Sequence, residues 1–330
     1  MNVLGIETSC DETAAAIVKD GKTVISNVVS SSLNFHKKYG GIVPEIAFRK
    51  QLETITQVVD CSLKEAGMSL EDIGLISVTD GPGLLGSLLV GISFAKALSL
   101  SRDIPLIGVN HLYSHIYAGF LNSKIAGFPF VSLVVSGGHT SLYYVPALNK
   151  ISLLGSTQDD ACGEAFDKVA RILNLGYPGG PEIEKRALCG DPKKIKFACS
   201  NTRKPLDFSF SGIKTAVLYY VRKSHKSDVA DICASFQESA LNTLVEKSLL
   251  ACRMKKVNTL VVGGGVAANS ALREKFNRSF AGMKLKVVFP EKKFSMDNAA
   301  MVAGLGFWLY KSKGRSALDL NVSLEERTRK

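Results

Sequence analysis

The sequence lacks several patterns that would place it in a familiar class. None of its seven cysteines forms a C-x-x-C pair, which argues against a disulfide framework and against a zinc knuckle. No G-x-x-x-x-G-K-[ST] motif occurs, so the chain has no P-loop. The first residues, MNVLGIETSCDE, reach an acidic pair too early for a signal peptide and contain no arginine-rich leader. These absences predict a soluble protein of the reducing cytoplasm.

An uninterrupted apolar run of membrane-spanning length is also missing. The most apolar stretch, GPGLLGSLLVGISFAKALSL, is broken by glycine, serine and Lys96, which favours a buried helix. Positive charge, in contrast, is in excess, because 41 Lys and Arg against 30 Asp and Glu give a formal net charge of +11. This excess is typical of a protein that binds RNA, DNA or a nucleotide, although a soluble basic enzyme would also show it. The basic residues form short clusters at 37–38, 49–50, 193–196, 255–256, 292–293 and the terminal RTRK.

Hydrophobic patterning predicts an α/β chain whose order of elements occurs twice. The first series has strands at 2–7, 13–19, 23–30, 73–79 and 105–109, and a helix from Pro44 to Ala66. After Pro129 the same order restarts, with strands at 130–136, 140–145, 151–156 and 259–264. The repetition indicates a duplicated α/β architecture with two lobes and a cleft between them.

The lobes are expected to divide near Gly127. Residues 1–127 would form the first lobe and residues 128–297 the second, which suits a chain of 330 residues. We expect a final helix, within about 298–330, to pack back on the first lobe. Residues 176–211 are rich in glycine, proline and lysine and should hold one short helix at most. Irregular segments of this length are more often functional than incidental.

Two histidines, His111 and His115, lie four residues apart in the segment NHLYSHIYAGF. On a helix they share one face and can both reach a single cation, although two ordinary histidines at a helix surface would show the same spacing. The protease motif H-E-x-x-H needs a glutamate where this chain has Leu112. Asp297 is a candidate third ligand, and its alternative role is a helix N-cap. Two histidines and one carboxylate would suit iron(II) or zinc.

Glycine-rich segments supply candidate sites for a phosphate or nucleotide. Ser136, Gly137 and Gly138 lie between two predicted strands, where backbone N–H groups can surround an anion, although a hairpin turn alone also favours glycine. The segment TLVVGGGVAANSAL runs from a strand through three glycines into a helix, and the amide of Asn269 could bind ribose or a base. The segment does not match the dinucleotide-binding fingerprint, because no acidic residue follows at the required distance.

Several other residues allow two interpretations. Ser211 and Lys214 fit S-x-x-K, but the other motifs of that acyltransferase class are missing, and Lys214 could instead contact RNA phosphate. Asp11 and Glu12, in the first predicted turn, either satisfy backbone donors or point into a cleft. Asp167 lies on an amphipathic helix, where a carboxylate is ordinarily solvated.

In these motifs the chain resembles the TsaD family, the bacterial-type tRNA N6-adenosine threonylcarbamoyltransferases, nearly from end to end. The motifs that carry the resemblance are GIETSCDETAAAIV, GGIVPEIAFR, GPGLLGSLLVGISFAKAL, NHLYSH, SGGHT, GEAFDKVARILNLGYPGGP, FSFSGIKTAV, ASFQ, GGVAAN and DNAAM. The resemblance implies an actin-like fold, similar to sugar kinases and Hsp70, with two lobes.

The resemblance also implies the residues of the site. The family's metal ligands correspond to His111, His115 and Asp297. Its substrate and nucleotide contacts correspond to Val134, Val135, Ser136, Gly137, Gly138, Asp167, Gly180, Glu184 and Asn269. Glu184 stands where the family usually has aspartate. Other departures are Gln51 for histidine, Tyr113-Ser114 for Glu-Gly, and Ser295-Met296 for Cys-Thr.

The activity implied by the resemblance is transfer of threonylcarbamoyl from its adenylate to N6 of adenosine 37 in ANN-decoding tRNA, with release of AMP. It further implies one divalent metal per subunit, Fe(II) or Zn(II), and a partnership with the paralogue TsaB and the ATPase TsaE, or a homodimer. The residues alone leave two other classes open, a metallopeptidase and an actin-like ATPase or phosphotransferase. No general base is evident in the sequence.

Overall fold

The computed structural model describes residues 1–122, 127–223, 228–316 and 318–323. The chain folds as two compact units, which we call unit 1 (Met1–Ala126 with Met296–Lys330) and unit 2 (Gly127–Ser295). Unit 2 is therefore a single continuous segment, whereas unit 1 is assembled from both ends of the chain. Asp297 belongs to unit 1, although the sequence analysis assigned residues up to 297 to the second lobe.

Unit 1 contains a five-stranded mixed sheet in the order β3-β2-β1-β4-β5. The strands are β1 (Asn2–Glu7), β2 (Glu12–Lys19), β3 (Thr23–Ser31), β4 (Leu75–Gly81) and β5 (Leu106–Asn110). The first three strands pair antiparallel, and β4 and β5 continue the sheet in parallel with β1. The helices of unit 1 are α1 (Leu33–His36), η1 (Lys37–Tyr39), α2 (Pro44–Ala66), η2 (Leu70–Asp72), α3 (Leu85–Arg102), α4 (His111–Ala118) and α10 (Ala299–Lys313).

Helix α2 has the bounds that the sequence predicts, because both ends carry strong signals. Pro44 occupies the first turn, where its missing N–H costs nothing, and Gly67 ends the helix in a left-handed conformation with φ of 64°. Ile55, Val58, Val59 and Leu63 recur on one face and are buried in the core of unit 1. This face packs against the alternate side chains Leu4 and Ile6 of β1.

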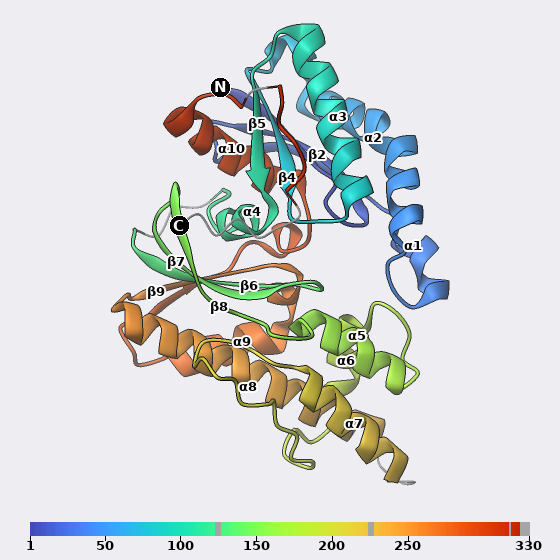
Figure 1. Ribbon diagram of the computed structural model, residues 1–330. Helices are drawn as coiled ribbons and strands as arrows, with labels where there is room; N and C mark the ends of the chain where they lie inside the picture. The colour runs from blue at the N-terminus through green and yellow to red at the C-terminus, as the bar shows by residue number, and fades with distance from the viewer. Residues whose placement is uncertain (123–126, 224–227, 317, 324–330) are drawn as a thin grey trace. The chain divides into compact units, whose positions relative to one another are not determined.

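Helix α10 covers the opposite face of the same sheet (Figure 1). Gly5 of β1 permits this contact, because a Cβ at that position would collide with the Ala299 carbonyl and with Ala303. Buried small and apolar residues from Ala299 to Phe307 line the contacting helix. The C-terminal segment of the chain therefore completes the core of unit 1.

Among the described residues, α3 is the one helix with the length and apolar composition of a membrane span. Its residues Val90, Ile92 and Ala95 are nevertheless part of the core of unit 1, together with β1 and β4. A core helix of a soluble protein passes the same test, so α3 gives only weak support to membrane insertion. The helix predicted in this stretch is confirmed, but it is buried on one face only, because Leu85, Leu89 and Leu100 are exposed.

Unit 2 repeats the sheet of unit 1, with strands in the order β8-β7-β6-β9-β10. The strands are β6 (Phe130–Val135), β7 (Thr140–Ala147), β8 (Lys150–Ser156), β9 (Thr259–Gly263) and β10 (Lys286–Val288). Again the three consecutive strands pair antiparallel and the two late strands pair parallel. The predicted duplication of an α/β series is thus confirmed in the strand order.

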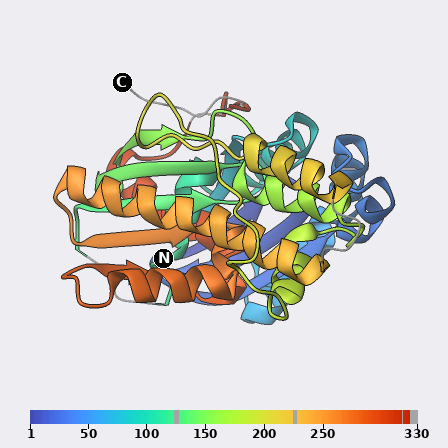
Figure 2. The ribbon, with the colours of Figure 1, turned by 90° about the horizontal axis from the view of Figure 1, so that it is seen from below.

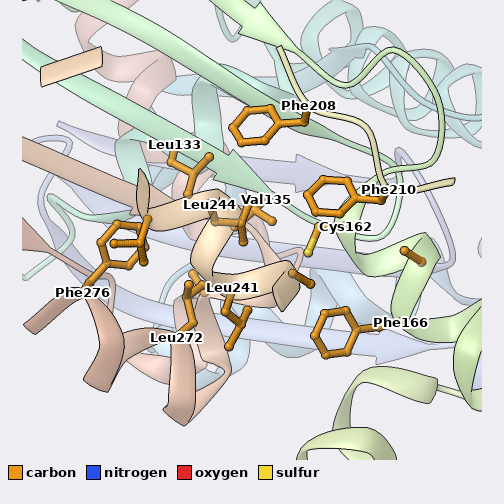
Figure 3. Close-up of a cluster of buried hydrophobic side chains, with 14 of the residues drawn as sticks. Leu133, Val135, Cys162, Phe166, Phe208, Phe210, Leu241, Leu244, Leu272 and Phe276 are labelled. Atoms are coloured by element: carbon orange, nitrogen blue, oxygen red, sulfur yellow. The ribbon is translucent and has the colours of Figure 1, made fainter. Parts of the chain in front are cut away.

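Helix α8 (Val229–Lys255) packs on strands of the second sheet (Figure 2), and α9 (Ser270–Phe280) packs on β10. The other helices of unit 2 are α5 (Cys162–Ile172), α6 (Gly179–Ala187), α7 (Ser211–Lys223), η3 (Gly265–Ala268) and η4 (Lys292–Phe294). Figure 3 shows how side chains from β6, α5, α8 and α9 meet in this core, with Leu133, Phe166, Leu241 and Phe276 among them. The core fixes the positions at which the strands of unit 2 end.

The irregular stretch predicted after Gly176 contains one short helix, α6, followed by coil up to α7. Side chains of α8 hold this coil, since the Ser235 hydroxyl accepts from the Ile195 amide at 3.2 Å and Ser239 donates to the Phe197 carbonyl at 2.7 Å. Lys247 donates to the Pro205 carbonyl at 3.1 Å. Near its end the segment also bonds to β8 and the loop after it, since the Phe208 amide donates to the Ser156 carbonyl at 3.0 Å. The segment is therefore held by hydrogen bonds to neighbouring elements rather than by its own secondary structure.

Candidate metal centre and nucleotide-binding residues

Helix α4 places His111 and His115 one turn apart, directly after β5. The Asn110 side chain begins the helix by accepting from the Tyr113 amide at 3.1 Å. Both imidazoles are buried, with exposed fractions of 5% and 0%, and their ring centroids lie 4.7 Å apart. The spacing predicted from the sequence therefore gives two imidazoles on one side of a helix.

Asp297, which lies immediately before α10, meets this histidine pair. Its Oδ1 is 3.0 Å from Nε2 of His115 and 3.8 Å from Nε2 of His111. One potential ligand atom from each residue lies within 4.8 Å of the others. The alternative role of Asp297 as an N-cap is wrong, because Asn298 caps α10 by accepting from the Met301 amide at 3.1 Å. The neighbouring asparagine thus leaves the Asp297 carboxylate available to the histidines.

A buried glutamate that the sequence analysis did not single out orients His111. Glu7, at the end of β1, has Oε2 3.0 Å from Nδ1 of His111. Thr79 on β4 donates to the same carboxylate at 2.7 Å, and the Ser9 amide donates to its other oxygen at 2.6 Å. Histidines that bind metals commonly use their second ring nitrogen in this way, and the bond leaves Nε2 of His111 on the side of Asp297.

The electrostatics of this centre favour positive charge. Burial opposes protonation of His111, yet the carboxylates of Glu7 and Asp297 outweigh it and raise the pKa of His111 to about 9. Burial, followed by the negative charges of Asp297 and Asp11, raises the pKa of Glu12 well above its usual value. The acidic turn between β1 and β2 therefore lies within electrostatic reach of Asp297.

The residues present fit a divalent cation. Two imidazoles and one carboxylate form a donor set that binds iron(II) or zinc and leaves coordination positions open. Nδ1 of His115 is buried and has no hydrogen-bond partner in the described part of the chain. The ring nitrogen that faces Asp297 is Nε2, at 3.0 Å, so the fit to a cation rests on this atom together with His111 and Asp297.

In unit 2, the candidate nucleotide contacts begin at the turn between β6 and β7. Val134 and Val135 are the last residues of β6, and Val134 pairs in parallel with Gly263 at the end of β9. Ser136 closes the turn, with its amide donating to the His139 carbonyl at 2.8 Å. Carboxyl ends of adjacent parallel strands are the usual place for ligands in open α/β sheets.

Three glycines near this turn have no packing reason to be glycine. A Cβ built on Gly137, Gly138 or Gly180 would meet no heavy atom within 4 Å in the described structure, and none of the three has a left-handed φ. Gly163 behaves differently, because a Cβ there would collide with the Ser136 carbonyl. Side chains are therefore absent from a space that the protein itself does not fill, as expected where a ligand approaches the backbone.

Hydrogen bonds connect the remaining candidates within unit 2. Asp167 on α5 accepts from the Gly179 amide at 2.7 Å, at the start of the helix that carries Gly180 and Glu184. Glu184 in turn accepts from the Ser270 amide at 2.7 Å, next to Asn269. Burial raises the pKa of Asp167, and the Gly179 and Gly180 amides oppose this rise. The nine predicted contacts thus belong to connected elements of one unit, and their role with a ligand stays a prediction.

The ambiguous residues of the sequence acquire definite partners. Lys214 pairs with Asp160 at 2.9 Å, and Lys168 pairs with the same carboxylate at 2.6 Å.

Gln51 is fully buried and donates to the carbonyls of Cys10 and Glu12 at 3.0 and 2.9 Å, so it holds the turn that carries Asp11 in place.

The other departures from the family pattern lie in both units. Ser114 donates to the Asn110 carbonyl at 3.1 Å within α4, and Ser295 accepts from Arg273 at 3.2 Å. Tyr113 is half-buried on α4, and Met296 is exposed. None of these departures replaces His111, His115 or Asp297.

Solved structures with similar folds include HypF of T. kodakarensis, with a TM-score of 0.64, 14% identity, and coverage of 98% of this chain and 49% of that chain. Component A of (R)-2-hydroxyglutaryl-CoA dehydratase from Acidaminococcus fermentans aligns with a TM-score of 0.57 at 18% identity, covering 93% and 98% of the two chains. At these identities the likeness concerns the fold alone, and it confirms the predicted actin-like α/β class.

Sequence comparison adds the family. The family model TsaD, described as tRNA N6-adenosine threonylcarbamoyltransferase, matches residues 23–304. The tRNA N6-adenosine threonylcarbamoyltransferase of Symbiobacterium thermophilum is 51% identical over 323 residues, which cover 97% of this chain and 95% of the relative. With these matches and the actin-like fold, the chain belongs to the TsaD family of tRNA N6-adenosine threonylcarbamoyltransferases.

Proposed function

We propose that this chain transfers the threonylcarbamoyl group from threonylcarbamoyl-AMP to N6 of adenosine 37 in ANN-decoding tRNAs and releases AMP. Membership of the family gives the reaction class. The observation that carries the proposal to particular residues is the convergence of His111, His115 and Asp297, whose ligand atoms lie within 4.8 Å of one another. The proposal divides the work, with the metal held by unit 1 and the adenylate by unit 2.

His111, His115 and Asp297 would hold one divalent metal per subunit, Fe(II) or Zn(II). When bound, such a cation supplies Lewis-acid polarisation of a carbonyl oxygen. Glu7 keeps Nδ1 of His111 engaged at 3.0 Å, so the other ring nitrogen stays available as a ligand. Burial of both imidazoles excludes water from this side of the centre and strengthens each electrostatic interaction there.

Unit 2 would bind the AMP part of the substrate. The backbone from Val134 to Gly138 would approach it without obstruction, since a Cβ on Gly137 or Gly138 would have no neighbour within 4 Å in the described structure. Asp167, Gly180, Glu184 and Asn269 would contribute the remaining contacts. The donor is a mixed anhydride that is already activated, so the chain's task is to align the reacting atoms and stabilise developing charge.

The tRNA would be positioned by phosphate contacts from the basic clusters of a chain whose formal net charge is +11. The terminal RTRK cluster lies outside the described residues. Binding that depends on phosphate contacts weakens steeply with salt. We further propose that the protein acts in the cytoplasm, together with a TsaB paralogue and a TsaE ATPase or as a homodimer.

One reaction tests the proposal. The purified chain, loaded with Fe(II) or Zn(II) and supplied with TsaB and TsaE, is mixed with threonylcarbamoyl-AMP and unmodified ANN-decoding tRNA. We expect the modified nucleoside, detected by mass spectrometry, together with stoichiometric AMP. A tRNA with guanosine at position 37 serves as the control. Absence of the nucleoside with every metal and partner combination would contradict the proposal.

The two other classes have less support. Leu112, at the position of the protease base, is fully buried and apolar, and the relative named above is called a transferase rather than a peptidase. The solved structures named above share only the fold with this chain. Peptide hydrolysis that His111→Ala abolishes, or ATP turnover without tRNA that survives metal removal, would favour a peptidase or an ATPase respectively.

A further inference from the structure

The amide of Asn269 has a fixed orientation, because helix α9 determines which of its two atoms faces the backbone. Asn269 is the N-cap of α9, and its Oδ1 accepts from the Leu272 amide at 2.8 Å. Only the oxygen can accept from an N–H group, so Nδ2 must point away from the helix. Nδ2 donates to Oε1 of Gln237 on α8 at 3.0 Å.

This bond fixes the amide of Gln237 in turn. Since Oε1 receives the Asn269 hydrogen, Nε2 of Gln237 must lie on the far side of its carboxamide. Gln237 is only 8% exposed as a residue, and none of the hydrogen bonds within the described ranges uses its Nε2. Nε2 is not among the fully buried polar atoms that lack a partner, so this nitrogen keeps access to solvent. An amide donor that is held in place and open to solvent can donate to a ligand that displaces the water.

We infer that Gln237 is a further ligand-binding residue, whose Nε2 donates to the nucleoside part of the adenylate beside Asn269. The inference rests on the proposed function, because it takes Asn269 as a contact of the same ligand. The covalent geometry of an amide places Nε2 of Gln237 within about 5 Å of Nδ2 of Asn269. Gln237 is part of the ASFQ motif, to which the proposed function gives no role.

The chemistry of the pair determines the ligand atom. One N–H hydrogen of Asn269 and two of Gln237 remain for a ligand, whereas each amide oxygen already accepts one hydrogen bond from the protein. The pair therefore favours a ligand that presents hydrogen-bond acceptors. The charged side chains nearby are of both signs, because Glu184 accepts from the Ser270 amide at 2.7 Å and Lys292 donates to the Ser270 hydroxyl at 3.4 Å. The two carboxamides themselves carry no net charge, so they suit neutral acceptors such as the ring nitrogens of the purine or the oxygens of the ribose.

Binding of AMP and of adenosine to the full-length, metal-loaded protein tests the inference by calorimetry. Gln237→Glu keeps an acceptor for Asn269 but removes the Nε2 donor, and Gln237→Met removes both groups at similar length. We expect both variants to bind AMP and adenosine roughly 10-fold more weakly than the wild type, with unchanged metal content. Gln57→Glu, an exposed position on α2, is the matched control and should bind both ligands normally.

The same measurements separate the possible failures. If the wild type binds AMP and adenosine and both Gln237 variants bind them equally well, Gln237 is not a ligand contact and only this inference falls. If the variants lose affinity for AMP but not for adenosine, the contact is to phosphate, and the assignment to the nucleoside is wrong. If the wild type binds neither ligand, the proposed adenylate site in unit 2 falls together with the inference. Thermal unfolding of each variant shows whether the fold is retained, and Gln237→Met provides the answer without an added charge.

Discussion

The two units have the same strand order but opposite chemistry at the turn between their first two strands. In unit 1 this turn, residues 8–11, is flanked by Glu7 and Glu12, and it contains Asp11. In unit 2 the turn, residues 136–139, contains Gly137 and Gly138 instead. Carboxylates at the first turn favour a cation nearby, whereas glycines at the second expose backbone donors to an anion or a nucleotide. On the proposed function, one architecture would therefore support two kinds of site, and the side chains at the turn would decide which.

The largest expected effect comes from removing a proposed metal ligand. This change should impair the metal centre of unit 1 and leave AMP binding by unit 2 intact. His111→Ala should lower metal content and transfer activity by on the order of 100-fold or more, and AMP should still bind to unit 2. Elemental analysis, calorimetry and the transfer assay measure the three quantities. His36→Asn is the control, because His36 is equally buried but bonds to Ser32 at 2.9 Å. Loss of AMP affinity in His111→Ala would contradict the assignment of metal binding to unit 1 and AMP binding to unit 2.

Glu7→Gln tests whether the carboxylates of unit 1 tune the centre. The amide keeps the shape of the side chain but removes the charge that orients His111, so metal affinity should fall roughly 10- to 100-fold. Competition with a metal chelator measures this affinity. Glu65→Gln, on the exposed surface of α2, should leave it unchanged, and an unaltered affinity in Glu7→Gln would mean that Glu7 is only structural.

Gly180→Ala tests the open glycines of unit 2. The added methyl has no neighbour within 4 Å among the described residues, and alanine is the better helix former, so stability should stay equal or rise by up to about 1 kcal/mol. AMP affinity should nevertheless fall, roughly 10-fold, because the methyl occupies ligand space. Gly282→Ala should lower stability and leave AMP affinity unchanged, because that loop glycine has a φ of +79°, which alanine adopts only with strain. Unchanged AMP affinity in Gly180→Ala would show that the open space beside Gly180 is not occupied by the ligand.

Asp160→Asn should have the smallest effect and should concern stability alone. Burial raises the pKa of this carboxyl, but hydrogen bonds from Lys168 and Lys214 outweigh it and lower the pKa below its usual value. The stabilisation is therefore present above pH ~4 and is lost as pH falls through the lowered pKa. At pH 7 the free energy of unfolding should drop by about 1–2 kcal/mol.

Urea unfolding of the wild type and of Asp160→Asn at several pH values measures this difference, which should shrink under acidic conditions. Asp60→Asn, at an exposed position of α2, controls for removal of a surface charge. A difference that stays constant down to pH 2 would show that the ion pairs are not its source.

Local signals in the sequence were sufficient for most of the fold. Proline and glycine at the two ends of α2 predict its bounds, and the apolar run of β6 predicts a strand within one residue of the observed end. The bounds are less accurate where neighbouring residues compete. DNAAM offers two successive capping residues, and α10 begins after Asn298 rather than at Asp297.

The site was only partly predictable, because its parts meet through tertiary contacts. The i, i+4 spacing indicates that His111 and His115 share a face, but no spacing rule connects them with Asp297, which is 182 residues from His115. Glu7 carried a signal that the sequence analysis did not use, namely a charged residue at the end of an otherwise apolar buried strand. Gln237 carried none, since its role depends on the polarity of an asparagine on another helix.

The insertion of unit 2 into unit 1 has a consequence for synthesis on the ribosome. Gly127–Ser295 is continuous, so this part can reach its folded state while the remainder is still being translated. The first unit must wait, because both the helix that covers its sheet and Asp297, one of the three proposed metal ligands, are encoded after codon 295. A nascent polypeptide interrupted before that point would thus present an uncovered apolar sheet and would lack one of these ligands, so on the proposed function metal binding must await the near completion of translation.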